Sequence, residues 1–345
     1  MTVQAAVTSR LLMPGFALAA GVGVAAVVAE PLLRQATGGR LALPVMVLAL
    51  VIGMALYPLA ARPLFAPGLT FAVKKLLRLA IALLGLRIAF GDIIGLGVGT
   101  LVLVVGSMAL TIASGIWLAR RLGLHDGYGA LAGAATAVCG ASATLATTTV
   151  LPNYPAKAAD TAFTVVAANA VSTLVMLTYP PLALLLGFDA TQTGILLGAT
   201  IHDMAQVVGA GYAISEPVGN SAVVVKLFRV FLLLPVVLAI GWWFMRQGRE
   251  AGEASVPVPV FALVFLALVV VNSVLPAVPA LAAPYAAVKP WLVTLSNAGL
   301  LIAIAALGLG TSVMAILSIG WRHVAVFFGA TGVILALVTA GLFVI

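Results

Sequence analysis

Long apolar runs, separated by short charged, proline-rich or glycine-rich breaks, fill almost the whole 345-residue chain. Cutting the chain at these breaks gives about eleven runs of ~20 residues, the length that one helix needs to cross a bilayer. The runs begin near Leu11, Leu41, Thr70, Val98, Gly127, Asp160, Gln192, Asn220, Val258, Val288 and Val324. The short alternating segments of a membrane β-barrel are absent. We therefore predict an all-α polytopic membrane protein with about eleven transmembrane helices.

Composition agrees with this class, because 63% of the residues are hydrophobic and only 8% are charged. No stretch between the runs is long enough for a second domain. We expect residues 1–345 to form a single transmembrane transporter unit, with residues 1–40 as an extra N-terminal helix and loop and residues 41–345 as a repeat-containing core. The single cysteine, Cys139, excludes an intrachain disulfide and a cysteine-built metal site, and we expect no cofactor.

The net charge of +8 does not indicate nucleic-acid binding, because Lys and Arg collect on the cytoplasmic loops of membrane proteins. If the N-terminus is cytoplasmic, the cytoplasmic side holds Arg10, Arg62, Lys74, Lys75, Arg78, Arg120, Arg121, Arg246, Arg249 and Arg322. The outer side then holds only Arg34, Arg40, Lys157 and Lys289. This asymmetry predicts an N-in, C-out protein.

Short internal similarities predict inverted repeats, and two registers remain open. In one, Ala82–Leu86 matches Ala305–Leu309, seven predicted spans later. In the other, Ala137–Gly140 matches Ala305–Gly308, five spans later. An odd displacement makes the two copies antiparallel, which is the symmetry of many secondary transporters.

The apolar run from Gly194 to Ile214 contains His202, Asp203 and Gln206 near its middle. Such side chains are costly in lipid and mark substrate or proton paths in many membrane proteins. His202 and Gln206 are four residues apart and share a helix face, which predicts that both contact substrate. His202 titrates near neutral pH, so we predict proton coupling through His202 and Asp203. In the alternative interpretation, Asp203 forms a structural ion pair with a basic residue on the next helix.

That next helix carries Lys226 and Arg229, which are three residues apart and share a face. Both side chains can bind an oxyanion, Arg as a planar fork and Lys as a point charge. The alternative is that both extend to the membrane interface.

Small and hydroxyl residues dominate the run around Gly140, where Ala141, Ser142 and Thr144 follow the glycine. Glycine allows a helix to unwind there, exposing backbone N–H groups that favour an anion. Tight helix packing is the competing interpretation. Gly310 and Thr311 repeat the pattern, either as a second break that binds substrate or as a helix C-cap.

Four of these segments resemble the YeiH-type sulfate exporter family in order and over nearly the whole chain. They are Cys139–Ala143, Ile201–Val207, Val225–Val230 and Ala306–Thr311. The resemblance implies a bacterial inner-membrane exporter of sulfate or sulfite. It also implies a fold akin to cation–proton antiporters and bile-acid transporters, with a panel, a core, two crossed broken helices and elevator movement. Such relatives are commonly homodimers.

Three function classes follow. The first is a secondary transporter that exports a small oxyanion or sulfonate, with protons or another ion as coupling partner. The second is a cation–proton antiporter that uses Asp203. The third is an intramembrane enzyme, which we do not expect because no HExxH or GxSxG motif accompanies His202 and Asp203. The sequence also contains no P-loop, so it does not indicate a self-contained ATP-driven pump.

Overall fold

The structure, a computed structural model, describes residues 2–36, 44–247, 259–311 and 320–345. Throughout these residues the regular secondary structure is helical and no strand is present, which confirms the predicted all-α class. Within the described residues, seven segments are long and apolar enough to cross a membrane: Leu11–Ala36, Gly97–Arg121, Lys157–Leu185, Glu216–Arg246, Val260–Ala277, Pro279–Leu309 and Trp321–Leu342. Together they make a multi-pass membrane protein. Arg40, Arg249 and the predicted run starts at Leu41 and Val258 lie outside the described residues.

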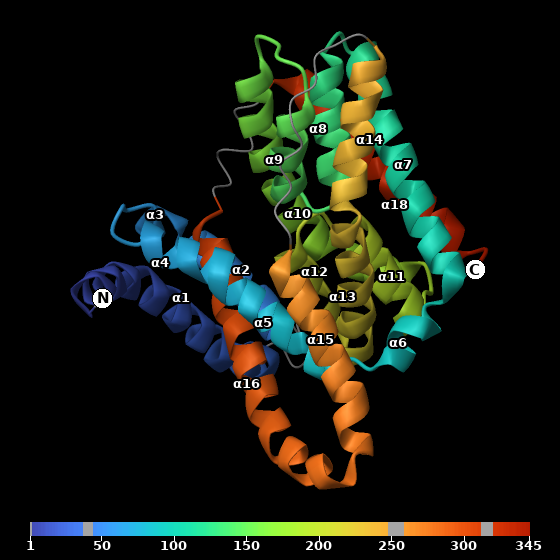
Figure 1. Cartoon of the computed structure of the whole chain (residues 1–345). Helices are drawn as coiled ribbons and strands as arrows, with labels where there is room; N and C mark the ends of the chain where they lie inside the picture. Colours follow the sequence, from blue (N-terminus) through green and yellow to red (C-terminus); the bar gives the residue numbers. More distant parts are fainter. Residues whose placement is uncertain (1, 37–43, 248–258, 312–319) are drawn as a thin grey trace. The chain divides into compact units, whose positions relative to one another are not determined.

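The chain folds into two compact units, and the first comprises Met1–Ile93 and Val260–Ser312. Its helices are α1 (Thr2–Ala36), α2 (Val45–Ala55), α3 (Tyr57–Ala60), α4 (Ala66–Phe71), a π-helical turn (Ala72–Leu76), α5 (Leu77–Leu84), a 3-10 turn (Gly85–Arg87), α15 (Val260–Val274), a second 3-10 turn (Leu275–Ala277) and α16 (Pro279–Leu309). Figure 1 shows α15 and α16 as neighbouring arms joined at one end. The short helix α6 (Phe90–Gly95) crosses the boundary to the second unit.

Two glycines bring α2 and α16 into backbone contact within the first unit. A Cβ atom on Gly53 would lie 2.7 Å from the Ala305 carbonyl oxygen, and one on Gly308 would lie 2.4 Å from the Leu50 carbonyl oxygen. Only glycine allows this approach, as is common where membrane helices pack through small residues.

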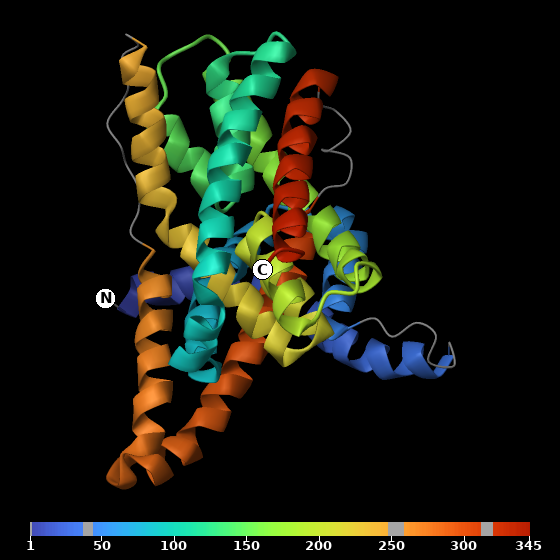
Figure 2. The same cartoon turned by 90° about the vertical axis from the view of Figure 1, so that its right-hand side faces the viewer.

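The second unit comprises Ile94–Pro259 and Val313–Ile345. Its helices are α7 (Gly97–Arg121), α8 (Asp126–Ala137), α9 (Ala141–Val150), α10 (Lys157–Leu185), α11 (Ala190–Thr200), α12 (Met204–Ile214), α13 (Glu216–Phe231), α14 (Leu233–Arg246) and α18 (Trp321–Leu342). Helix α7 packs along both α8 and α18, and Figure 2 shows α7 and α18 side by side.

Helices α8 and α9 form a hairpin that turns back instead of crossing the unit. The rings of His125, which precedes α8, and Tyr154, which follows α9, stack with their centroids 4.0 Å apart. The start of α8 and the end of α9 therefore lie at the same end of the unit. The expectation of a single span beginning near Gly127 is wrong for this reason.

Helices α11 and α12 form a second hairpin. A Cβ atom on Gly194 of α11 would lie 3.0 Å from the Val218 carbonyl oxygen, and one on Gly211 of α12 would lie 2.8 Å from the Gly219 Cα. Both hairpin ends therefore adjoin the start of α13. The two hairpins enter the unit from opposite ends, with α8 and α9 above and α11 and α12 below in Figure 1.

Because of the hairpins, Lys157 lies on the side opposite to the one predicted from the sequence. Lys157 follows Tyr154, and Tyr154 stacks on His125 close to Arg120 and Arg121. Lys157 was expected outside and the two arginines inside, but all three lie at one end of the second unit. A hydropathy pattern shows how many apolar residues follow one another but not whether the chain turns back. Two consecutive helices of 12 and 10 residues therefore have the same hydropathy as one transmembrane helix.

Candidate functional site

The tip of the first hairpin is the helix break expected at Gly140. Helix α8 ends at Ala137 and α9 begins at Ala141. Gly140 has φ +59° and ψ −121°, a backbone conformation that favours glycine. Thr144 fixes the turn, because its buried Oγ1 donates to the Gly140 carbonyl oxygen over 3.0 Å.

The tip of the second hairpin is formed by Ile201, His202 and Asp203, which separate α11 from α12. Asp203 caps α12, since its carboxylate accepts from the Met204 N–H over 2.6 Å. Its own N–H donates to Ser172 Oγ on α10 over 3.0 Å. The two tips touch, because a Cβ atom on Gly140 would lie 3.7 Å from the His202 carbonyl oxygen.

Lys226 and Arg229 on α13 are both 0% exposed and lie against both tips. The Lys226 Nζ donates to the carbonyl oxygens of Val138, Ile201 and His202 over 2.7, 2.8 and 2.5 Å. These contacts use all three of its donors. The lysine therefore links the end of α8 to the end of α11.

Arg229 makes a second link between the same helix ends. Its Nη2 and Nε donate to the carbonyl oxygens of Thr136 and Ala137 over 2.6 and 2.8 Å. Its Nη1 donates to those of Gly198 and Ile201 over 2.9 and 3.1 Å. Helix C-termini carry partial negative charge, so each cation stabilises two of them at once. Neither side chain extends to the membrane interface.

The interpretation of a structural ion pair with Asp203 is wrong. Among the described residues, no carboxylate oxygen lies within ion-pair distance of Lys226 or Arg229. Two buried cations thus stand beside one half-buried carboxylate, Asp203. When Lys226, Arg229 and Asp203 are all ionised, their net charge is +1.

His202 faces away from the exposed side of the tips, although substrate contact was expected of it. Its Nε2 lies 3.0 Å from Thr331 Oγ1, and its ring stacks on Phe327 with centroids 5.4 Å apart. Both partners belong to α18. The ring is 0% exposed, and its Nδ1 has no hydrogen-bond partner among the described residues.

Gln206 is also buried and faces α10. Its Nε2 lies 3.5 Å from Asn169 Oδ1 and 3.4 Å from Thr173 Oγ1, while its Oε1 has no partner within the described structure. Ser142 is exposed, and Ala141 is half-buried beside it. Gly140, the N-cap residue of α9, has no side chain to cap the helix, and the Cys139 sulfur lies against the Ala143 N–H, which leaves the N–H groups of Ala141 and Ser142 without a cap among the described residues. The structure therefore leaves the first N–H groups of α9 open at a partly accessible tip.

Gly310 and Thr311 belong to the first compact unit, whereas the two hairpin tips belong to the second. Helix α16 ends at Leu309, and the Gly310 N–H donates to the carbonyl oxygens of Ala306 and Leu307. The C-cap interpretation is therefore confirmed for Gly310. Thr311 Oγ1 donates to the Leu307 carbonyl oxygen over 2.8 Å.

A second polar cluster in the same unit carried no signal in the sequence. His323 Nε2 on α18 lies 3.1 Å from Asp160 Oδ1 on α10, and Tyr128 on α8 donates to the His323 carbonyl oxygen over 2.6 Å. Burial, with the nearby Asp160 carboxylate, raises the pKa of the Tyr154 hydroxyl. Nothing in the local sequence pattern around His125 or His323 indicates such contacts. Only their partners, distant in sequence, reveal a role in packing.

Metal binding has no support in the described part of the chain, where no three His, Cys, Asp or Glu side chains form a group suited to a metal ion.

Comparison with known proteins gives consistent matches along the chain. The model of a family described as "Conserved hypothetical protein 698" matches residues 14–327. The UPF0324 membrane protein TauZ of Paracoccus pantotrophus is 40% identical over 334 residues, which cover 95% of this chain and 94% of that protein. The UPF0324 membrane protein CT0845 of Chlorobaculum tepidum is 40% identical over 303 residues, covering 86% and 82%. No solved structure matches the sequence.

Proposed function

This chain belongs to the UPF0324 family of membrane proteins, which is the YeiH-type family that its motifs resemble, and from that premise we propose that it is a secondary transporter for a small anion. The proposed substrates are sulfate, sulfite or a small sulfonate, exported across the bacterial inner membrane. A negative-inside membrane potential drives an anion outward.

One observation carries the proposal: the N-terminus of α9, whose N-cap residue has no side chain to cap it, opens at a tip whose fixed charge is positive. The N–H groups of Ala141 and Ser142 begin α9 and have no acceptor within their helix. Lys226 and Arg229 lie buried behind them, with Asp203 as the nearest carboxylate. Burying unbalanced charge is costly, so an anion at the tip stabilises the site.

This arrangement gives the predicted residues different tasks. The anion contacts the N–H groups after Gly140 and the Ser142 hydroxyl. Lys226 and Arg229 attract the anion through their electric field and do not contact it, because their N–H groups already donate to backbone carbonyl oxygens. Gly140 and Thr144 hold the turn that presents the N–H groups.

The two opposed hairpins also support the inverted architecture expected from the sequence. We propose that the tips at residues 138–140 and 201–203 are equivalent positions of two inverted repeats, a register that differs from both of those predicted from the sequence. The second compact unit would then be the moving core and the first unit the panel. Elevator movement and a homodimer remain parts of this proposal.

Substitution of Ser142 tests the site directly. Ser142→Asp places a carboxylate at the second position of α9, where it competes with a substrate anion while suiting the helix dipole. We expect sulfate- or sulfite-induced currents on solid-supported membranes to fall at least tenfold, without loss of thermal stability. Ser142→Asn, nearly the same shape but neutral, is the matched control and should retain most of the current. Undiminished current in Ser142→Asp would remove the α9 N-terminus from the site.

Proton coupling is tested through Asp203. A carboxylate near the bound anion repels it, so protonation of Asp203 and anion binding should favour each other. We expect anion affinity in the wild type to increase as pH falls, and Asp203→Asn to bind with little pH dependence, as measured by calorimetry in detergent. His202→Gln is the comparison. If His202→Gln loses the dependence while Asp203→Asn keeps it, His202 is the coupling group.

The same current assay distinguishes the proposed anion transporter from a cation–proton antiporter. Sulfate, sulfite, thiosulfate, taurine and chloride are compared with sodium and potassium at two pH values. Currents that require sodium or potassium, vanish in Asp203→Asn and ignore every anion would replace the anion transporter with the antiporter.

A further inference from the structure

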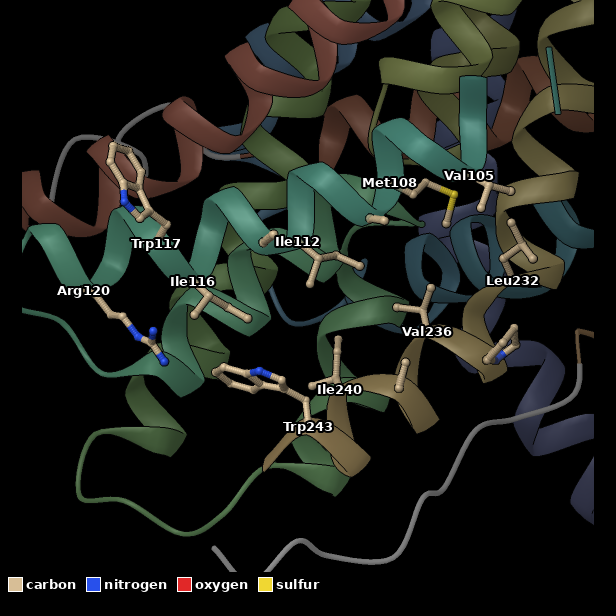
Figure 3. Close-up of a pocket in the computed structure, with 14 residues that line it drawn as sticks. Val105, Met108, Ile112, Ile116, Trp117, Arg120, Leu232, Val236, Ile240 and Trp243 are labelled. Atoms are coloured by element: carbon tan, nitrogen blue, oxygen red, sulfur yellow. The ribbon is translucent and has the colours of Figure 1, made fainter. Parts of the chain in front are cut away.

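An apolar groove runs between α7 and α14 in the second unit, away from the hairpin tips. Its volume is about 550 Å³. Side chains from Val105 to Arg120 on α7, Leu232 just before α14, and residues up to Trp243 on α14 line it, as Figure 3 shows. Apart from the guanidinium of Arg120 and the indole N–H groups, this lining is hydrocarbon or thioether.

One end of the groove is strongly basic. The Arg120 guanidinium lies 5.5 Å from the ring centroid of Trp243 and so bridges α7 and α14. Next to it, the Arg121 guanidinium lies 5.2 Å from the Trp117 ring, and that of Arg246 lies 4.4 Å from the Trp242 ring. Tryptophan and arginine together mark the membrane interface. This end therefore lies at headgroup level, and the rest of the groove extends into hydrocarbon.

The charge at this end exceeds what the neighbouring carboxylate balances. Arg120 forms an ion pair with Asp126, with Nε 2.7 Å from Oδ1. Among the described residues, no carboxylate pairs with Arg121 or Arg246, which lie at the ends of two helices, where C-terminal carbonyl groups favour cations. A phosphate group with its negative charge complements this pair.

The groove is long enough to hold a lipid tail together with part of its headgroup. From Val105 to Arg120 the helix rises ~22 Å, while one leaflet contributes about 15 Å of the hydrocarbon core. We propose that the groove binds one anionic glycerophospholipid, with an acyl chain between α7 and α14 and the phosphate at Arg121 and Arg246. The proposal does not depend on which substrate the protein transports.

Native mass spectrometry of the purified full-length protein tests the site. The probes are phosphatidylglycerol and phosphatidylcholine with identical acyl chains. We expect phosphatidylglycerol to bind at least fivefold more tightly. Arg121→Gln combined with Arg246→Gln should weaken it about 25-fold, because each basic residue near a charged lipid contributes about fivefold. Ala113→Trp with Ala239→Trp should fill the groove and remove retention of both lipids.

Two matched controls exclude general effects of the substitutions. Arg322→Gln removes another arginine that lies over a tryptophan, and Ala336→Trp adds an indole to an exposed position of α18. Both should bind lipid like the wild type. Equal affinity for the two lipids in the wild type, or groove variants that bind like the controls, would overturn the proposal. Loss of a dimer in the tryptophan variants with unchanged lipid retention would assign the groove to a second copy instead.

Discussion

At the scale of single residues, the buried cations decide what the tips can do. Unwound hairpin tips expose carbonyl oxygens that lipid cannot satisfy. Together, Lys226 and Arg229 donate hydrogen bonds to the carbonyl oxygens of six residues: Thr136, Ala137, Val138, Gly198, Ile201 and His202. The two side chains act as structural links as well as a source of positive field. We therefore expect replacement of either side chain to destabilise the folded protein as well as to weaken anion binding.

Lys226→Met should destabilise the protein strongly. The change leaves the carbonyl oxygens of Val138, Ile201 and His202 without this donor, at about 1–3 kcal/mol for each unsatisfied group. We expect a large drop in the thermal unfolding temperature of the purified protein. Arg322→Met, which removes an interfacial cation from over the Trp321 ring, is the control and should change it little. Equal unfolding temperatures for the two variants would show that Lys226 does not hold the tips together.

At the scale of helices and hairpins, the sequence predicted the break at Gly140 but not the direction that the chain takes after it. Glycine within a run of small residues indicates the first break. The second break lies at Ile201–Asp203, where the sequence indicated only polar site residues and instead offered Gly310 as a second break. Whether a chain continues or turns back after a break depends on contacts between distant residues. His125 with Tyr154, and Gly194 with Val218, provide these contacts here. The partners of His202 on α18 are more than a hundred residues away, so local pattern could not reveal them.

The cluster that joins α10 to α18 gives a prediction at this scale. Asp160→Ala removes the buried carboxylate, 4% exposed, that accepts from His323 and supports the packing of Tyr128 and Tyr154. We expect about 1–3 kcal/mol of lost stability, measured by unfolding, because a buried polar partner is left unsatisfied. Asp126→Ala is the matched control, since Arg120 in that pair is 53% exposed and surface pairs contribute at most about 1 kcal/mol. A larger loss in Asp126→Ala than in Asp160→Ala would contradict the role given to the cluster.

At the scale of the whole molecule, folded-back hairpins change the sidedness of the loops. Arg120, Arg121, Lys157, Arg246 and Arg322 gather at one end of the second unit, because α7, α9, α14 and α18 meet there through His125, Tyr154, Trp243 and His323. Asp189 and Glu216 lie at the opposite end, beyond the 29 residues of α10 and beside the start of α13. From the positive-inside rule we predict that the arginine-rich end is cytoplasmic.

Cysteine labelling distinguishes this arrangement from eleven successive spans. In a Cys139→Ser background, single cysteines replace Leu122, Ala156 and Thr191, and an impermeant maleimide is added to intact cells from which the outer membrane has been stripped. The hairpins predict that positions 122 and 156 stay protected until the cells are permeabilised, whereas position 191 reacts at once. Eleven continuous spans predict the reverse for positions 156 and 191, because each broken helix would then cross the membrane. Labelling at 156 without permeabilisation would therefore require α8 and α9 to continue across the bilayer, which the stacking of Tyr154 on His125 does not allow.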